Sequence, residues 1–194
     1  MLVSLHIVEE SIDIVLPAGR EELARLKVGS RVHLFGHIYT MRDAGHKRTL
    51  ESLEQSGRLP YGLEGQALFY AGPTPPVAPK PAVGSTPARG GRPFGAIGPT
   101  TASRMDAATP ALLRAGITLT LGKGQRSKEV IDACAETGSV YLMAVGGAAA
   151  YLGGFVEESE LIAWEDLGTE ALRRLKLNGM PAYVGIDTTG ATLW

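Results

Sequence analysis

The stretch ITLTLGKGQRSKEVIDACAETGSVYLMAV, residues 117–145, decides the fold class of this chain. Its first part, 117–121, predicts a strand that Gly122-Lys123-Gly124 ends. Apolar residues at helical spacing predict a helix over 127–137, and 140–145 predicts a second strand. A strand, a helix and a further strand at this spacing are typical of a parallel or mixed α/β sheet.

The same alternation continues on both sides of this stretch. Strands are predicted at 12–16, 32–40, 67–71, 161–164 and 182–186, and helices at 20–26, 43–55 and 166–175. A helical, alanine-rich segment follows Gly146-Gly147, and Gly57 is placed to end the helix at 43–55. We therefore expect a single α/β domain over residues 1–194, with a mixed central sheet flanked by helices.

Residues from about 73 to 97 differ in composition from the rest of the chain. Proline and glycine dominate and large apolar side chains are few, which predicts a long loop. A structureless loop of this length inside a compact domain is usually functional or flexible. Two interpretations stay open: the loop lies over a ligand bound at the Gly98-Pro99 turn that follows it, or it is a disordered connector.

Composition argues against several classes of function. The chain has 194 residues and a net charge of −1, so no global field attracts nucleic acid or an anionic membrane. No apolar run approaches the roughly 20 residues that span a bilayer, and the first residues do not resemble a signal peptide. We expect a cytoplasmic protein. Its one cysteine, Cys134, cannot by itself hold a zinc ion or an iron–sulfur cluster and is interpreted as a core residue of a helix.

The sequence Gly98-Pro99-Thr100-Thr101-Ala102-Ser103-Arg104-Met105-Asp106 has the features of an anion site. Proline is favoured at a helix start, and Thr100 or Thr101 can serve as the N-cap. Free backbone N–H groups in the first turn, together with Arg104 one turn later, would then bind a carboxylate. The alternative is an ordinary capped helix with a surface arginine.

Two further cations stand at strand-to-helix junctions. Lys123 lies between two glycines at the carboxyl end of a strand, where open α/β sheets bind ligands, although a solvated turn lysine is the alternative. Arg42 ends another strand, and Asp43 is placed to cap the next helix. His46 would lie near that helix start, to bind an anion, to transfer a proton or to serve a structural role. Three such cations suit a small dicarboxylate, but no group of residues here completes a reaction, so we expect half of a site.

These residues also carry a family resemblance. The motifs, in chain order, are YTxRDAxHK at 39–47, FYAGP at 69–73, GPTTxxRMD at 98–106, KG at 123–124, GGxAA at 146–150 and WEDLGxEA at 164–171. Together they resemble the β subunit, or C-terminal domain, of class I fumarate hydratase and L(+)-tartrate dehydratase. The resemblance covers residues 12–190, and Gly45 departs from it where the family often has alanine.

The resemblance implies a fold, a cofactor and a partner. The fold would be a swivelling β/β/α domain. The cofactor would be a [4Fe–4S] cluster ligated by a cysteine-bearing α subunit, with which this chain would form a hetero-oligomer; alone, the chain could form a homodimer. In family terms the general acid comes from the partner, so the isolated chain would fold without hydratase activity.

The resemblance also assigns roles to residues of this chain. Arg42, Arg104 and Lys123 would hold substrate carboxylates, and Thr100 would face the carbon that loses its proton. Thr101, His46 and Asp106 are additional candidates. The expected reaction is hydration of fumarate to L-malate. The alternatives are a β subunit that acts on L(+)-tartrate or another 2-hydroxydicarboxylate, and a standalone dicarboxylate-binding module.

Overall fold

The structure is a computed structural model that describes residues 11–74 and 95–194. Its strands are β1 Ile12–Leu16, β2 Arg31–Thr40, β3 Ala67–Phe69, β4 Leu119–Gly122, β5 Val140–Met143, β6 Val156–Ala163 and β7 Leu172–Ile186. Its α-helices are α1 Arg20–Leu23, α2 Asp43–Ser56, α3 Thr109–Arg114, α4 Lys128–Thr137 and α5 Ala149–Leu152. Short 3-10 helices are η1 Pro60–Gly62, η2 Ala102–Met105, η3 Gly153–Phe155 and η4 Glu165–Glu170. The chain is therefore of the α/β class.

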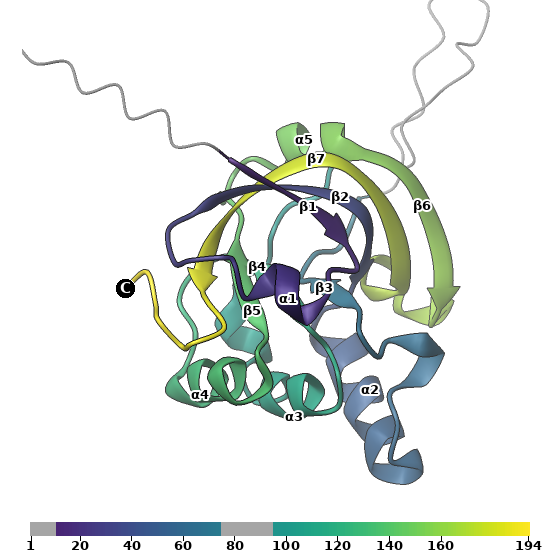
Figure 1. Cartoon of the computed structure of the whole chain (residues 1–194). Coiled ribbons are helices and arrows are strands. Elements are labelled where there is room, and N and C mark those ends of the chain that lie inside the picture. The colour runs from purple at the N-terminus through teal and green to yellow at the C-terminus, as the bar shows by residue number, and fades with distance from the viewer. Residues whose placement is uncertain (1–10, 75–94) are drawn as a thin grey trace, which may run out of the picture.

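The seven strands form one mixed sheet in the order β1-β2-β3-β4-β5-β7-β6 (Figure 1). Neighbours among β1 to β5 pair in parallel, whereas β7 runs antiparallel to β2, β5 and β6. The additional pairing of β7 with β2 closes β2, β3, β4, β5 and β7 into a barrel-like ring. This closure was not expected from the sequence, and the swivelling character of the domain stays a prediction.

Two apolar cores stabilise the ring, one on each face of its strands. Along β3 and the residue after it, Ala67 and Phe69 belong to one core, whereas Leu68 and Tyr70 belong to the other. The first core gathers side chains from every strand of the ring and includes Leu23 of α1. The second core joins the sheet to α3 and α4, which lie together below it in Figure 1. Burial on both faces explains why strands such as β3 are continuously apolar.

The C-terminal part differs most from the sequence-based expectation. The predicted helix over 166–175 is wrong: η4 ends at Glu170, and β7 begins at Leu172. The side chains of Arg174 and Lys176 pair with Glu160 and Glu158 across the neighbouring strand β6. Cross-strand ion pairs and burial on β2 therefore outweigh the helix propensity of leucine, arginine and lysine.

Strand β6 begins at Val156, five residues before the predicted strand at 161–164. The prediction missed its first half because that half is rich in glutamate. Charged side chains conceal a strand from pattern analysis, yet they are typical of the exposed edge of a sheet. The predicted strand at 182–186 is likewise only the last part of the 15-residue β7.

Most of the predicted proline- and glycine-rich loop, residues 75–94, lies outside the described residues. Its described ends meet, because the Thr74 amide donates to the Ala96 carbonyl at 2.9 Å and the Gly95 amide donates to the Thr74 carbonyl at 3.1 Å. No helix within the described part of the chain is long and apolar enough to cross a membrane.

Candidate functional site

The predicted site residues follow the carboxyl ends of parallel strands. Arg42 follows β2, and Lys123 follows β4. The segment 97–102, which carries Thr100 and Thr101, lies against the residues that follow β3 and β4: Pro99 bridges to Ala71, and Thr101 bridges to Lys123. Since parallel strands end on one edge of a sheet, the topology gathers these residues there.

Thr100 and Lys123 are joined through their backbones. The Thr100 amide donates to the Tyr70 carbonyl at 2.6 Å, and the Lys123 amide donates to the Thr100 carbonyl at 3.1 Å. The Ala102 amide in turn donates to the Lys123 carbonyl at 2.9 Å. The helix begins where predicted, with Thr101 as its N-cap residue. It is, however, only the four-residue 3-10 helix η2, and its N-cap side chain makes no capping hydrogen bond.

The Lys123 side chain borders a cavity of about 250 Å³ at this edge. Met143, Val145, Gly146 and Tyr183 also line the cavity. A Cβ atom at Gly146 would stand 3.4 Å from Cδ of Lys123, so glycine leaves the lysine room to extend along the loop. None of the ion pairs between described residues includes Lys123.

Arg42 is half-buried between the strand end and η4. Its Nη2 lies 3.5 Å from Oε1 of Glu170, whose Oε2 accepts a hydrogen bond from the Ala44 amide at 3.0 Å. A Cβ atom at Gly72 would come within 3.1 Å of Nη1 of Arg42 and 2.8 Å of the Thr169 carbonyl oxygen. Glycine at position 72 therefore makes space for this guanidinium.

Arg104 pairs with Asp43, the neighbour of Arg42 in sequence. Its Nε donates to Oδ1 of Asp43 at 3.0 Å, and its Nη2 donates to Oδ2 at 2.7 Å. This bidentate pair fixes the plane of the guanidinium. The predicted cap is wrong, because the Asp43 carboxylate makes no capping hydrogen bond to α2 and binds Arg104 instead.

Asp106 lies beneath this edge. Its Oδ1 accepts from Nε of Arg126 at 2.6 Å, and its Oδ2 accepts from the Ser127 amide, at the start of α4, at 2.7 Å. Both carboxylate oxygens are thus engaged within the protein. The Arg126 side chain is fully buried, and nothing in the sequence around it distinguishes it from a surface arginine.

His46 is buried in the first turns of α2, with 2% of its surface exposed. Its Nδ1 lies 2.8 Å from the Arg42 carbonyl, and its ring packs edge-on against Tyr70 at 5.1 Å between centroids. Burial, with a smaller contribution from the Arg126 charge, lowers the pKa of His46 to about 4, against the opposing effects of the hydrogen bond to the Arg42 carbonyl and of Asp43. His46 is therefore neutral at pH 7, with Nδ1–H donating to Arg42, and the geometry supports a structural role instead of proton transfer.

The buried His46 predicts a pH dependence of stability. Because the unfolded chain protonates His46 near pH 6.5 and the folded chain only near pH 4, its contribution is lost as the pH falls through this window. The loss between pH 7 and 4.5 is roughly 2.5 kcal/mol. Urea unfolding at both pH values should show a smaller loss for His46→Asn, whose amide can still donate to Arg42. Equal losses in the two proteins would show that His46 already titrates normally in the folded chain.

The described residues of this chain do not form a metal centre of their own. Cys134 is buried in α4, and burial raises the pKa of its thiol to about 12, so it is a poor source of thiolate. Within the described ranges no group of three or more histidine, cysteine, aspartate or glutamate residues could hold a metal ion. The residues described here therefore do not fit an iron–sulfur cluster.

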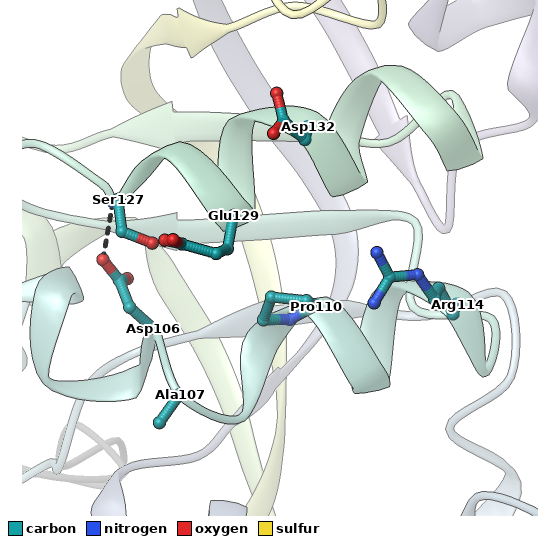
Figure 2. A pocket seen from close by; sticks show the side chains of 7 residues that line it. All are labelled: Asp106, Ala107, Pro110, Arg114, Ser127, Glu129 and Asp132. Carbon is teal, nitrogen blue, oxygen red and sulfur yellow. Dashed lines mark hydrogen bonds between the residues drawn. The ribbon is translucent and has the colours of Figure 1, made fainter.

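A separate cavity of about 560 Å³ lies between α3 and α4 (Figure 2). Asp106, Glu129 and Asp132 are among its lining residues, and its one lining cation, Arg114, is paired with Glu136 at 2.8 Å. An acidic lining repels a dicarboxylate, and the lining of this cavity does not include Arg42, Arg104 or Lys123. The edge that carries Thr100 and Lys123 is thus the better candidate site.

Comparisons with known proteins agree with the resemblance. Residues 5–194 match the family model described as "Fumarase C-terminus". The chain is 34% identical to the anaerobic class I fumarate hydratase of Escherichia coli strain K12 over 87% of its own length and 29% of that enzyme. It is 36% identical to the mitochondrial fumarate hydratase 1 of Leishmania major over 90% of its own length and 30% of that protein. The chain therefore spans about three tenths of the fumarate hydratases that it matches.

A relative of similar length carries a different name. It is the protein of Methanocaldococcus jannaschii named "Putative L(+)-tartrate dehydratase subunit beta". The chain is 31% identical to it over 90% of its own length and 87% of that protein. The matched relatives thus include longer proteins and a subunit of the size of this chain.

Proposed function

The chain belongs to the fumarase C-terminus family, and from this membership and the geometry of the site we propose that it is the β part of a hydro-lyase, most simply one that hydrates fumarate to L-malate. The observation that supports this best is the pairing of Thr101 with Lys123, which holds Thr100 and a lysine on one edge of the sheet. We also propose that residues 1–194 act as one swivelling domain, in the cytoplasm.

Arg42, Arg104 and Lys123 would bind the two carboxylates of the substrate. Arg104 uses the N–H of Nε and one N–H of Nη2 for its hydrogen bonds to Asp43. The other N–H groups of its guanidinium could donate to a ligand. Arg42, which pairs with Glu170, would likewise donate hydrogen bonds to a ligand from its remaining N–H groups. Since Asp43 and Glu170 offset the charges of the two arginines, Lys123 would supply most of the net attraction for the dianion.

Elimination of water from a 2-hydroxydicarboxylate first removes a proton from the carbon next to a carboxylate. Negative charge then builds on that carboxylate, and fixed cations around it lower the barrier. The Thr100 hydroxyl would face the reacting carbon, held by the backbone bonds of Thr100 to Tyr70 and Lys123. A hydroxyl of ordinary acidity is a weak base, so Thr100 would position the substrate or relay the proton. Thr101 would lie at the rim of the same site.

We propose that the cofactor is a [4Fe–4S] cluster ligated by a cysteine-bearing α subunit, a proposal that the relative named as a subunit beta supports. Such a cluster, bound in the partner, would supply a Lewis acid for the leaving hydroxyl. The apolar residues beside Lys123 support a partner at this edge: Val145 and Tyr183 are 61% and 40% exposed. The assembly would be a hetero-oligomer.

A second candidate reaction is dehydration of L(+)-tartrate. The relative named as a tartrate dehydratase β subunit favours it, because that protein has nearly the length of this chain. The additional hydroxyl of tartrate requires one more hydrogen-bond partner than malate.

The experiment is anaerobic co-expression of this chain with a candidate α subunit, cluster reconstitution, and initial rates with fumarate and with tartrate. Activity that requires both chains would support the proposal, and the faster substrate would identify the reaction. A stable, cluster-loaded complex that is inert towards both substrates would overturn it. A chain that assembles with no such partner but binds dicarboxylates would instead be a standalone binding module.

A further inference from the structure

We infer that the buried ion pair of Asp106 and Arg126 is a positioning device, which sets Thr100 and Arg104 in register with Lys123. The inference rests on the proposed function for the identity of the substrate but on the contacts below for the geometry. Asp106 and Arg126 touch no substrate in this account and would act only through the residues that they hold.

The device joins two segments of the chain. The threonine segment, residues 99–106, carries Thr100 and Arg104, and the lysine segment, residues 122–127, carries Lys123. At one end they are joined by the backbone bonds between Thr100, Ala102 and Lys123. At the other end they are joined by Asp106, whose two oxygens accept from the Arg126 side chain and the Ser127 amide. Arg104 lies between these two connections, so its position depends on both.

Arg126 connects these two segments to Tyr70, which follows β3, and to Tyr141 of β5. Its guanidinium donates to Oγ1 of Thr109 at 2.8 Å and lies over the rings of Tyr70 and Tyr141, at 5.2 and 4.8 Å from their centroids. The same two tyrosines hold the two segments. The Tyr70 carbonyl accepts the Thr100 amide at 2.6 Å, and the Tyr141 hydroxyl donates to the Gly124 carbonyl at 2.8 Å.

The side chains of Asp106, Arg126 and Tyr141 each make a hydrogen bond within the protein. Burial raises the pKa of Tyr141 well above its usual range, so its hydroxyl remains a donor at Gly124. The side chain of Arg126 is 0% exposed and that of Asp106 is 13% exposed. Buried ion pairs contribute little net stability compared with a well-packed apolar substitute, because both charges lose their hydration. In this protein the benefit of the pair is a unique arrangement of the neighbouring segments, because Asp106 and Arg126 join the segments that carry the candidate site residues.

Two variants separate positioning from stability. Asp106→Asn leaves the Arg126 charge buried without its counter-charge, so it should lower both stability and activity. Asp106→Asn combined with Arg126→Met removes both charges and retains an acceptor for the Ser127 amide, so it should recover stability. If the pair positions the site, the double variant regains stability but not activity. Leu26→Ala is the matched control, because Leu26 is fully buried in the other core and its loss destabilises the fold away from the site.

The measurements are kcat and KM of the assembled enzyme, and amide hydrogen exchange of this chain. We expect kcat/KM to fall roughly 10- to 100-fold in both Asp106 variants, with a lower kcat, because small displacements of catalytic groups are costly. Exchange should accelerate at the Ala102 and Lys123 amides, which connect the segments, and Leu26→Ala should change neither quantity at a temperature where it is folded.

Full recovery of kcat/KM in the double variant, or unchanged exchange at Ala102 and Lys123, would overturn the inference. An equal loss of activity in folded Leu26→Ala would do the same. If the unmodified complex hydrates no fumarate and dehydrates no tartrate, the proposed function fails, and the exchange measurement still decides whether Asp106 and Arg126 hold the segments together.

Discussion

Lys123→Met is expected to lower kcat/KM of the assembled enzyme by roughly 100- to 1,000-fold, the usual effect of removing one charge-stabilising group from an active site. No ion pair among the described residues includes Lys123, and in the proposed site its ammonium group would bind a substrate carboxylate. Methionine keeps the length and the apolar contact along Gly146 but removes the ammonium group. Initial rates at saturating substrate give kcat and initial rates at limiting substrate give kcat/KM. We expect both constants to fall.

Lys128→Met is the matched control for Lys123. Lys128 is an exposed lysine in the first turn of α4, paired with Asp132 in the same helix. An exposed pair of this kind contributes little, so the control should retain its activity. If both substitutions have the same effect, the loss reflects the general charge of the subunit, and Lys123 has no special place in the site.

Thr100→Val is expected to lower kcat by roughly 100- to 10,000-fold if its hydroxyl takes part in the proton transfer, the range associated with acid–base groups. Valine has nearly the same shape as threonine, and the backbone bonds of Thr100 to Tyr70 and Lys123 do not need the side chain. The reason for the loss would therefore be the hydroxyl group itself. Steady-state kinetics of the assembled enzyme would measure it, and KM should change much less than kcat.

Thr100→Ser restores the hydroxyl and should recover most of the activity. Thr118→Val serves as the control, because Thr118 is also partly buried but immediately precedes the amino end of β4, far along the strand from Lys123. A Thr100→Val enzyme with normal kcat would show that the proton is handled by another group, and the role proposed for Thr100 would be abandoned.

The sequence was sufficient to identify the α/β class and the junctions that carry the site. Strand β4 ends at Gly122, within one residue of the predicted end, and β3 ends at Phe69, two residues before the predicted end. Gly57 ends α2, as predicted, in the left-handed conformation that favours glycine. These features are local, so the residues that determine them are neighbours in the chain. The same is true of Arg42 and Lys123, which follow strands whose apolar character is evident without a structure.

The remaining features depend on partners distant in sequence. The closure of the ring requires β7 to pair with β2, more than 130 residues away, and the helix propensity of 166–175 gives no sign of it. The ion pairs Arg104–Asp43 and Arg126–Asp106 likewise join residues 61 and 20 positions apart. No spacing rule connects such residues, so the sequence predicted a capping role for Asp43 and did not reveal its pairing with Arg104.

An anaerobic crystal structure of the assembled enzyme with a bound dicarboxylate would show whether this chain contributes the cations that bind the substrate. We predict that the carboxylate oxygens lie within hydrogen-bond distance of Arg42, Arg104 and Lys123, with the Thr100 hydroxyl beside the carbon next to one carboxylate. A dicarboxylate held entirely by the partner subunit, with Lys123 facing solvent, would contradict it.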